Sequence, residues 1–335
     1  MKSQFIVLSI SSEAQELLKK EISIRYTDLK FSFQTSSFLS YKIIPGAIDL
    51  PELQAYEFTY CYSRALFHSK CSKKQLAEKL RQIAKEFSSK VWCYFRTPQP
   101  DIELPIPILP PCAGNDGDIV LEIHSINSSE KEMWVCTREF STLDNPYYLE
   151  DIILPKNSPS RAYLKIAQAF QRFNLKQFGP DQIFLELGAA PGGVAYYLLT
   201  HNQKIIGIDT GEMDTILFKQ EFSSNPVLAN IKLPVQSVRK NDVEKAQQRL
   251  GKNHFDWLVC DLNLPLQVSF NESMRISQYS DNLTGFLITL KTPDLSSVMD
   301  ALRIYEKFKS VHKFKSRLVH IPANKKECLL FALKT

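Results

Sequence analysis

Phe184-Leu-Glu-Leu-Gly-Ala-Ala-Pro-Gly-Gly193 is a hydrophobic run that leads directly into a glycine-rich turn. The run predicts a strand, and the glycines predict a turn whose backbone can approach a ligand without interference from Cβ atoms. Glu186 places a carboxylate near the end of this strand. The spacing G-x-x-x-G-G differs from the dinucleotide fingerprint G-x-G-x-x-G. The residues of the predicted turn are Gly188, Ala189, Ala190, Pro191, Gly192 and Gly193.

A second apolar run, Ile205-Ile-Gly-Ile208, ends at Asp209. An acidic residue at the end of the next strand is typical of contacts to the ribose of a nucleotide-like cofactor. Together with Glu186, it predicts a binding site for S-adenosylmethionine. The alternative is a glycine turn that serves only sheet packing. Asp242 offers either a contact to the adenine amino group or an ordinary helix cap, since Asp is favoured at such caps.

Four charged residues occupy positions where a sheet delivers side chains to its ligand edge. Asp261 ends the apolar run that starts at Trp257, Lys291 ends Gly285-Phe-Leu-Ile-Thr-Leu290, and Glu327 opens a strand-like segment. Lys165 lies in a predicted helix that begins near Ser160 and falls outside its apolar face. Each residue alone is compatible with a solvated charge.

Taken together, Lys165, Asp261, Lys291 and Glu327 resemble the Lys-Asp-Lys-Glu tetrad of FtsJ-like ribose 2′-O-methyltransferases. Within that superfamily, residues 156–335 resemble RlmM-type enzymes of large-subunit ribosomal RNA most closely. Similar features include Asp256-Trp-Leu-Val-Cys-Asp261, Leu290-Lys-Thr-Pro293 and Asn324-Lys-Lys-Glu327. The resemblance implies methyl transfer from S-adenosylmethionine to a ribose 2′-hydroxyl of RNA.

A ribose hydroxyl is a weak nucleophile, so it needs a base as well as correct positioning. A lysine can act as that base near neutral pH only if burial or a second cation lowers its pKa. Two converging lysines are expected to meet this condition. The resemblance favours Lys291 as the base, with Lys165 holding the 2′-oxygen, Asp261 orienting Lys291 and the methyl group, and Glu327 holding Lys165. The residues alone do not decide between the two lysines.

The chain has 335 residues and a hydrophobic content of 44%, which are ordinary values for about two globular domains. The longest apolar runs are too short to cross a membrane, so a cytoplasmic protein is expected. The seven cysteines form no C-x-x-C pair, and the six histidines show no ligand spacing. Reduced thiols and the absence of a metal site are therefore expected.

The two halves of the chain differ in charge. Residues 1–155 carry 17 Lys and Arg against 20 Asp and Glu, a net of −3. Residues 156–335 carry 24 against 16, a net of +8. A basic run near the C-terminus offers contacts to RNA phosphates, with a solvated surface as the alternative. It contains Arg303, Lys307, Lys309, Lys313, Lys315 and Arg317.

Residues 1–155 predict a separate α+β region. Strands are expected at 5–10 and 91–95, amphipathic helices from Ser12 and over 76–87, and a hairpin pairing 119–124 with 133–138 across Asn127-Ser-Ser. The family resemblance implies a ferredoxin-like domain and a THUMP RNA-capture domain here. Six prolines within residues 97–111 exclude a continuous helix, so the THUMP domain is expected to be abbreviated or absent.

The predicted fold is a doubly wound, mostly parallel, Rossmann-like α/β sheet over residues 156–335, closed by an antiparallel hairpin between residues 313 and 333. A smaller α+β domain precedes it. The leading functional prediction is methylation of ribosomal RNA at a ribose 2′-oxygen. Methylation of a base or a protein is one alternative, and an RNA-binding module that keeps the cofactor fold without activity is another.

Overall fold

The computed structural model describes residues 4–44, 58–111, 114–126, 132–142, 144–219 and 227–334. They form two compact units, each built on a seven-stranded sheet. The first unit takes in the described residues up to Leu149, except 58–59, together with Gln171–Asn174. The remaining described residues form the second unit. The main division falls between Leu149 and Glu150, a few residues before the junction expected at 155/156.

The sheet of the first unit has the strand order β2-β3-β1-β4-β7-β6-β5. All neighbouring strands are antiparallel except β5 and β6, which are parallel. The expected hairpin forms from β6 and β7, and its turn Asn127-Ser-Ser lies outside the described residues. The strands are β1 (Phe5–Ser9), β2 (Leu29–Gln34), β3 (Phe38–Ile43), β4 (Ser63–Cys71), β5 (Val91–Phe95), β6 (Ile119–Ser125) and β7 (Met133–Glu139).

Two helices of the first unit follow the predicted amphipathic patterns. Helix α1 (Gln15–Arg25) comes directly after the 3-10 turn Ser12–Ala14 and buries Leu18 and Ile22. Helix α3 (Leu76–Ala84) follows the 3-10 turn Lys73–Gln75, and its apolar stripe packs in one cluster with residues of β6 and β7. The described proline-rich residues 97–111 contain no helix, as predicted. The ferredoxin-like and THUMP assignments remain predictions.

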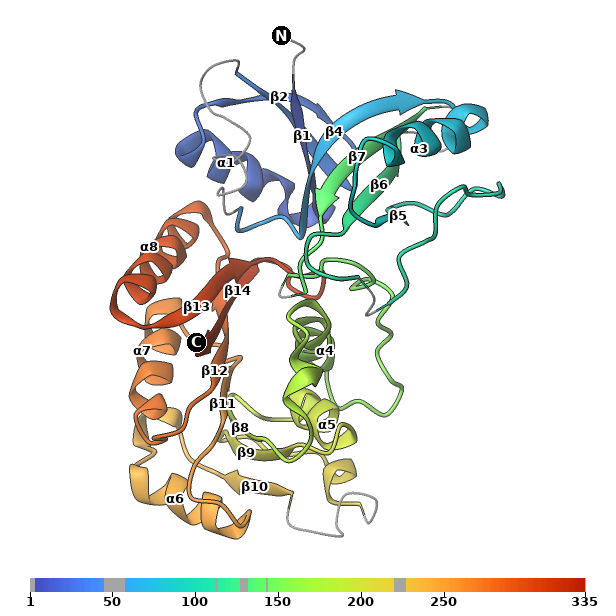
Figure 1. Ribbon diagram of the computed structural model, residues 1–335. Helices are drawn as coiled ribbons and strands as arrows, with labels where there is room; N and C mark the ends of the chain where they lie inside the picture. The colour runs from blue at the N-terminus through green and yellow to red at the C-terminus, as the bar shows by residue number, and fades with distance from the viewer. Residues whose placement is uncertain are drawn as a thin grey trace. The chain divides into compact units, whose positions relative to one another are not determined.

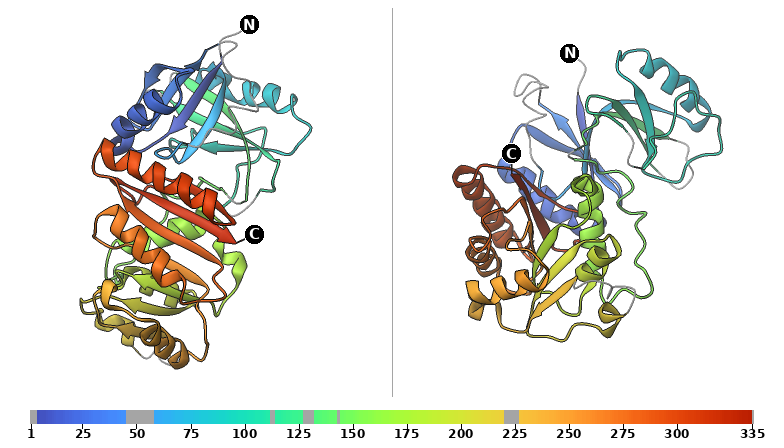
Figure 2. Two further views of the ribbon diagram at one scale, coloured as in Figure 1. Left: turned by 90° about the vertical axis from the view of Figure 1, so that its left-hand side faces the viewer. Right: turned by 60° about the horizontal axis from the view of Figure 1, so that its bottom comes forward.

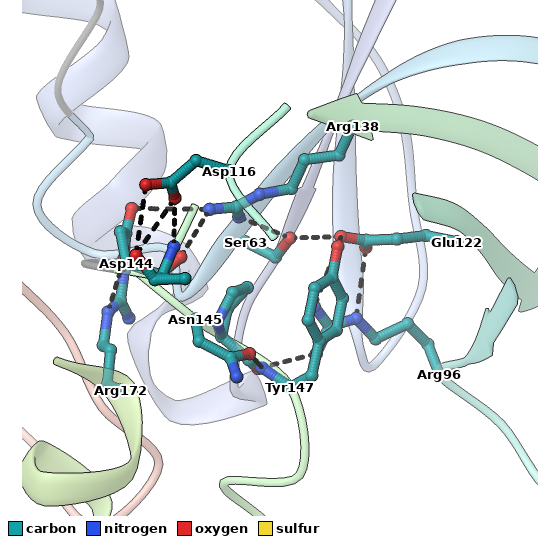
Figure 3. Close-up of polar contacts among 11 residues, drawn as sticks. Ser63, Arg96, Asp116, Glu122, Arg138, Asp144, Asn145, Tyr147 and Arg172 are labelled. Atoms are coloured by element: carbon teal, nitrogen blue, oxygen red, sulfur yellow. Dashed lines mark hydrogen bonds and ion pairs between the residues drawn. The ribbon is translucent and has the colours of Figure 1, made fainter. Parts of the chain in front are cut away.

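A buried polar network connects the strands of the first unit at Glu122, whose side chain is fully buried (Figure 3). The carboxylate accepts hydrogen bonds from Ser63 Oγ at 2.5 Å, Tyr147 Oη at 2.9 Å and Arg96 Nε at 3.1 Å. Arg138 Nη1 donates to Ser63 Oγ at 3.0 Å. Burial raises the pKa of Glu122, but the charge of Arg96, together with the neighbouring His124 and the charge of Arg138, outweighs burial, so this pKa lies well below its usual value.

The network continues from Arg138 to Asp144. Asp144 Oδ2 accepts from Arg138 Nη2 at 3.4 Å, and Oδ1 accepts from Arg172 Nε at 2.9 Å. Positive and negative charges therefore alternate through the network. Buried ion pairs add little net stability over apolar packing, but the loss of one partner leaves an uncompensated charge. The network thus makes the first unit sensitive to the ionisation of its carboxylates.

The sheet of the second unit has the order β10-β9-β8-β11-β12-β14-β13, parallel except for β14, which is antiparallel to both of its neighbours. This confirms the predicted doubly wound sheet with its C-terminal hairpin. Figure 2 shows the parallel strands, in yellow-green to orange, continuing into the red hairpin. The strands are β8 (Ile183–Leu187), β9 (Lys204–Ile208), β10 (Leu228–Ile231), β11 (Trp257–Cys260), β12 (Gly285–Lys291), β13 (Phe314–Val319) and β14 (Glu327–Lys334).

Helices cover both faces of this sheet, with α4 and α5 on one face and α6, α7 and α8 on the other (Figure 1). Strands β8 and β11 are buried along their whole length, as expected for central strands of such a sheet. No helix in the described part of the chain combines the length and the apolar character needed to span a membrane. The helices are α4 (Ala162–Arg172), α5 (Gly193–Thr200), α6 (Lys240–Arg249), α7 (Leu266–Ser277) and α8 (Leu295–Val311).

Candidate active site

The turn between β8 and α5 contains three glycines whose missing side chains leave room for other parts of the protein. Gly188 has φ +85°, and a Cβ atom there would lie 2.9 Å from the carbonyl oxygen of Asp261. Gly192 has φ +112°, and its Cβ would collide with the Leu217 side chain. A Cβ on Gly193 would lie 2.8 Å from the Ser160 carbonyl oxygen. Internal packing therefore accounts for these glycines, and their contact with a ligand remains a prediction.

Asp209 follows β9 and holds this turn in place. Its Oδ2 accepts a hydrogen bond from Ala190 N at 3.0 Å, and its Oδ1 accepts one from Gly211 N at 2.8 Å. A carboxylate can accept about four hydrogen bonds, so capacity remains for hydroxyl groups of a ligand. The structure thus places Asp209 beside the glycine turn, and its contact with a cofactor ribose remains a prediction.

Glu186 is almost completely buried at 1% exposure, and its Oε2 has no hydrogen-bond partner among the described residues. Burial raises the pKa of Glu186 well above its usual value, and the charges of Asp261 and Asp209 raise it further. These three acidic residues come from β8 and from the ends of β11 and β9, which neighbour β8 on either side. A ligand with positive charge would relieve their mutual repulsion. S-adenosylmethionine carries a sulfonium and an ammonium group, so the acidic residues fit this cofactor.

The side chains of Lys165, Asp261, Lys291 and Glu327 converge at one point. Lys165 Nζ lies 2.9 Å from both carboxylate oxygens of Asp261. Lys291 Nζ donates to Glu327 Oε1 at 2.6 Å and to Asp261 Oδ1 at 3.2 Å. Lys165 Nζ is also 2.7 Å from Glu327 Oε2, as an ion pair without hydrogen-bond geometry. Each carboxylate therefore contacts both lysines.

The fold explains this convergence. Lys291 ends β12, Glu327 begins β14, and the antiparallel register places the two residues directly opposite each other. Asp261 follows the neighbouring strand β11, and Lys165 comes from the first half of α4. A small, mostly apolar cavity under the tetrad is lined by Lys165 and Asp261 and by side chains of α4, α5, β11, β12 and β14.

The tetrad contains both expected pairings and adds two more. Asp261 contacts Lys291 as expected, but it also binds Lys165 through both oxygens, at shorter distances. Glu327 contacts Lys165 as expected, and it also contacts Lys291 at 2.6 Å. The register of β12 and β14 explains this last contact, because it fixes Glu327 opposite Lys291.

The pKa of Lys291 differs from the expectation. Burial lowers it, but the negative charges of Asp261 and Glu327, together with the hydrogen bonds that Lys291 donates to them, outweigh burial, so the net effect raises this pKa above its usual value. The two carboxylates, and not a second cation, therefore decide the direction of this pKa shift. In this arrangement Lys291 is a protonated donor, and it must lose a proton before it can act as a base.

Asp242 lies in the first turn of α6, where its Oδ2 accepts from the backbone nitrogen of Arg239 at 3.0 Å. Of the two alternatives for this residue, the geometry favours the helix cap over the adenine contact. The capping contact is local in sequence, so it forms whether or not a cofactor is bound.

The basic run near the C-terminus is divided between two faces of the sheet. Arg303, Lys307 and Lys309 belong to α8, which packs through Phe308 on Phe286. Lys315 and Arg317 pair in register with Leu333 and Phe331, which share their sheet face with Glu327. Lys315 and Arg317 therefore lie on the sheet face that carries the tetrad, and the expected contacts of the basic run with RNA phosphates remain a prediction.

Sequence reasoning missed Gln168, which lies three residues after Lys165 on α4 and is 3% exposed. Its Oε1 accepts from Ala323 N at 2.7 Å, in the segment that leads to Glu327. A single polar residue within a helix gives no signal of such a contact, because its partner is 155 residues away. Among the described residues, no group of three or more His, Cys, Asp and Glu is placed to hold a metal ion.

Comparison with known proteins agrees with this geometry. Residues 159–320 match the family of FtsJ-like methyltransferases. The matched region includes Lys165, Asp261 and Lys291 but ends before Glu327. The match to a methyltransferase family also supports the prediction that S-adenosylmethionine is the cofactor.

Curated relatives named ribosomal RNA large subunit methyltransferase M resemble part of the chain. The protein of Pseudomonas paraeruginosa is 27% identical over 122 residues, which are 35% of this chain and 30% of the relative. That of Cellvibrio japonicus is 32% identical over 141 residues, 40% of this chain and 35% of the relative. The similarity thus spans about a third of each relative's length.

Solved structures show a weaker likeness. TrmN from Thermus thermophilus aligns over 99% of both chains with a TM-score of 0.33 and 10% identity. A putative rRNA methylase from Clostridium thermocellum aligns over 54% of this chain and 98% of that chain, with a TM-score of 0.35 and 14% identity. Likenesses of this size do not bear on function.

Proposed function

We propose that this protein transfers a methyl group from S-adenosylmethionine to a ribose 2′-hydroxyl of RNA, with large-subunit ribosomal RNA as the substrate. The observation that carries the proposal is the convergence of two lysines and two carboxylates beside the glycine turn. The names of the curated relatives support the choice of RNA. A cytoplasmic location is part of the same proposal.

The tetrad supplies what a ribose hydroxyl needs. When bound, S-adenosylmethionine supplies an activated methyl group, so the protein has to position the hydroxyl and remove its proton. Lys165, fixed by both oxygens of Asp261, is placed to hold the 2′-oxygen. Lys291, once neutral, accepts the hydroxyl proton on Nζ, and Glu327 fixes the direction of Nζ.

Acidic residues are proposed to bind the cofactor. Asp209 accepts the ribose hydroxyls of the cofactor, and Asp261 and the buried Glu186 face its positively charged groups. The turn from Gly188 to Gly193 gives the cofactor a floor of backbone. In the first unit, we retain RNA capture as the proposed role.

The direct test is a single-turnover assay on unmodified large-subunit ribosomal RNA, followed by mapping of 2′-O-methyl groups. Lys291→Ala should lower the rate by at least about 100-fold, the usual contribution of a general base. Cofactor affinity measured by calorimetry should stay unchanged, because Lys291 acts on the nucleophile.

Lys165→Ala should be similarly severe, since no other group holds the 2′-oxygen. Near-normal rates for both lysine variants would refute the tetrad mechanism. Methyl groups found on a base or on a protein, with unmodified ribose, would favour the first alternative function. Cofactor binding without transfer to any substrate would favour the RNA-binding module.

A further inference from the structure

The segment 320–326 between β13 and β14 is tied at several points to the elements that carry the tetrad. Ala323 N donates to Gln168 Oε1 of α4 at 2.7 Å, and Lys326 O accepts from Thr292 N, just after β12, at 2.8 Å. Ile321 is fully buried and Asn324 is 2% exposed. The segment therefore has a fixed path against the helix of Lys165 and the strand of Lys291.

Two lysines occupy the outer side of this segment, immediately before Glu327. Lys325 and Lys326 are both exposed. Neither side chain has a hydrogen bond or an ion pair with any residue that the structure describes. In this respect they differ from Lys165 and Lys291, whose ammonium groups are held by carboxylates.

The charges of the tetrad are balanced, so the charges of Lys325 and Lys326, unpaired among the described residues, decide whether this region attracts an anion. Within the tetrad, two lysines and two carboxylates sum to zero, so the tetrad itself offers no net attraction to an anion. Lys325 and Lys326 therefore provide uncompensated positive charge at the residues next to Glu327.

We propose that Lys325 and Lys326 bind the phosphate groups of the RNA strand on either side of the target ribose. This inference rests on the proposed function. In RNA the 2′-oxygen neighbours the 3′-phosphate of the same nucleotide, so a ribose at the tetrad brings phosphates close to the following residues of the protein. Lysine side chains contact phosphates as point charges and do not read the base, so the pair positions the strand without selecting its sequence.

The fixed path of the segment suits this role. A charged side chain on a mobile loop would lose backbone entropy on binding, and that loss would weaken the contact. Here the contacts of Ala323 and Lys326 with α4 and β12 have already fixed the backbone. The same contacts fix the backbone of this segment beside the elements that carry Lys165 and Lys291.

The test compares the full-length wild type with the Lys325→Ala/Lys326→Ala variant. Binding of a fluorescent single-stranded RNA is measured over a range of salt concentrations, and methyl transfer is measured on unmodified large-subunit ribosomal RNA. The variant should lose about 0.7 of slope in log affinity against log salt for each phosphate contact removed. Its KM for RNA should rise about tenfold, the effect of roughly 1.4 kcal/mol. Its kcat and its affinity for S-adenosylmethionine should stay within about twofold of wild type.

Lys240→Ala/Lys245→Ala is the matched control, because it removes two exposed lysines of α6 in the same unit. This control should keep the wild-type slope, and Lys325→Arg/Lys326→Arg should retain most of the binding. An unchanged slope in the Lys325/Lys326 variant, or an equal loss in the α6 control, overturns the proposal. A lower kcat with unchanged KM also overturns it, since the pair would then act on Glu327. A wild type that binds RNA with this salt dependence but transfers no methyl group would instead contradict the proposed function.

Discussion

At the residue scale, Lys291 shows how neighbouring charges decide what a side chain can do. Its ammonium group lies between Asp261 and Glu327, and their negative charge raises its pKa despite partial burial. Glu327 makes the shortest of these contacts and also pairs with Lys165. We therefore expect Glu327→Ala to lower the single-turnover rate severely.

The raised pKa leads to a prediction about pH. Only the neutral form of Lys291 can accept a proton, and a raised pKa makes this form rarer at neutral pH. The single-turnover rate should therefore increase with pH by about tenfold per unit across the neutral range.

The measurement is the rate of methyl transfer at saturating cofactor, with cofactor affinity determined at each pH. Lys291→Ala should give a residual rate that is nearly independent of pH. A wild-type rate that is flat across this range would exclude Lys291 as a base that titrates above it, and would direct attention to Lys165.

At the scale of elements, the tetrad depends on α4, β12 and β14 being held together beside the reacting groups. Strand register holds β12 and β14 together and places Lys291 opposite Glu327. The hydrogen bond from Ala323 N to Gln168 Oε1 holds the segment before β14 against α4. We expect this bond to act on catalysis through the position of Glu327.

Gln168→Leu tests the bond. Leucine has a similar size but no acceptor, so Ala323 N loses its partner and the segment before Glu327 loosens. The transfer rate should fall by about tenfold, corresponding to roughly 1.4 kcal/mol, while cofactor affinity stays unchanged. Gln247→Leu is the matched control, since it replaces a buried glutamine of α6. Equal losses of rate in both variants would indicate general destabilisation.

At the scale of the whole molecule, the two units are built on different interactions. The second unit has a central sheet of buried apolar strands. The first unit encloses ionised groups, with Glu122 and Arg96 paired in its interior. The stability of the first unit should therefore fall more steeply on acidification than that of the second unit.

The lowered pKa of Glu122 decides the direction in which the stability of the first unit changes with pH. In the unfolded chain this carboxylate titrates near 4.5, and in the folded protein well below that value. Its stabilising contribution is complete above about pH 4.5 and is lost as the pH falls through the folded pKa. The protection of the β6 and β7 amides against hydrogen exchange, relative to their intrinsic exchange rates, should therefore fall on acidification before that of β8 and β11.

The Glu122→Gln variant tests at neutral pH whether the buried ion pair stabilises the first unit. It removes one partner of a buried ion pair and should destabilise the first unit by about 3 to 5 kcal/mol, while its exchange becomes less dependent on pH. Glu78→Gln on α3 is the control, since that carboxylate pairs with Arg81 at the exposed surface. Exchange in Glu122→Gln equal to that of the control would show that the network adds no stability.

The sequence by itself determined the α/β sheet and the glycine turn, whereas the four residues of the tetrad were predicted from the resemblance to FtsJ-like enzymes. The sheet and the turn depend on local patterns, because an apolar run sets a strand, and the end of a parallel strand sets where the next polar side chain lies. The hairpin of β6 and β7 and the break caused by the prolines at 97–111 have the same local origin.

Tertiary structure alone decided which charges meet. The pairing of Glu327 with Lys291, and the opposite shift in the pKa of Lys291, come from strand register across 36 residues. The contact of Gln168 with Ala323 and the division of the basic run between two faces arise in the same way. Electrostatic effects depend on distances between residues remote in sequence, and periodicity carries no information about those distances.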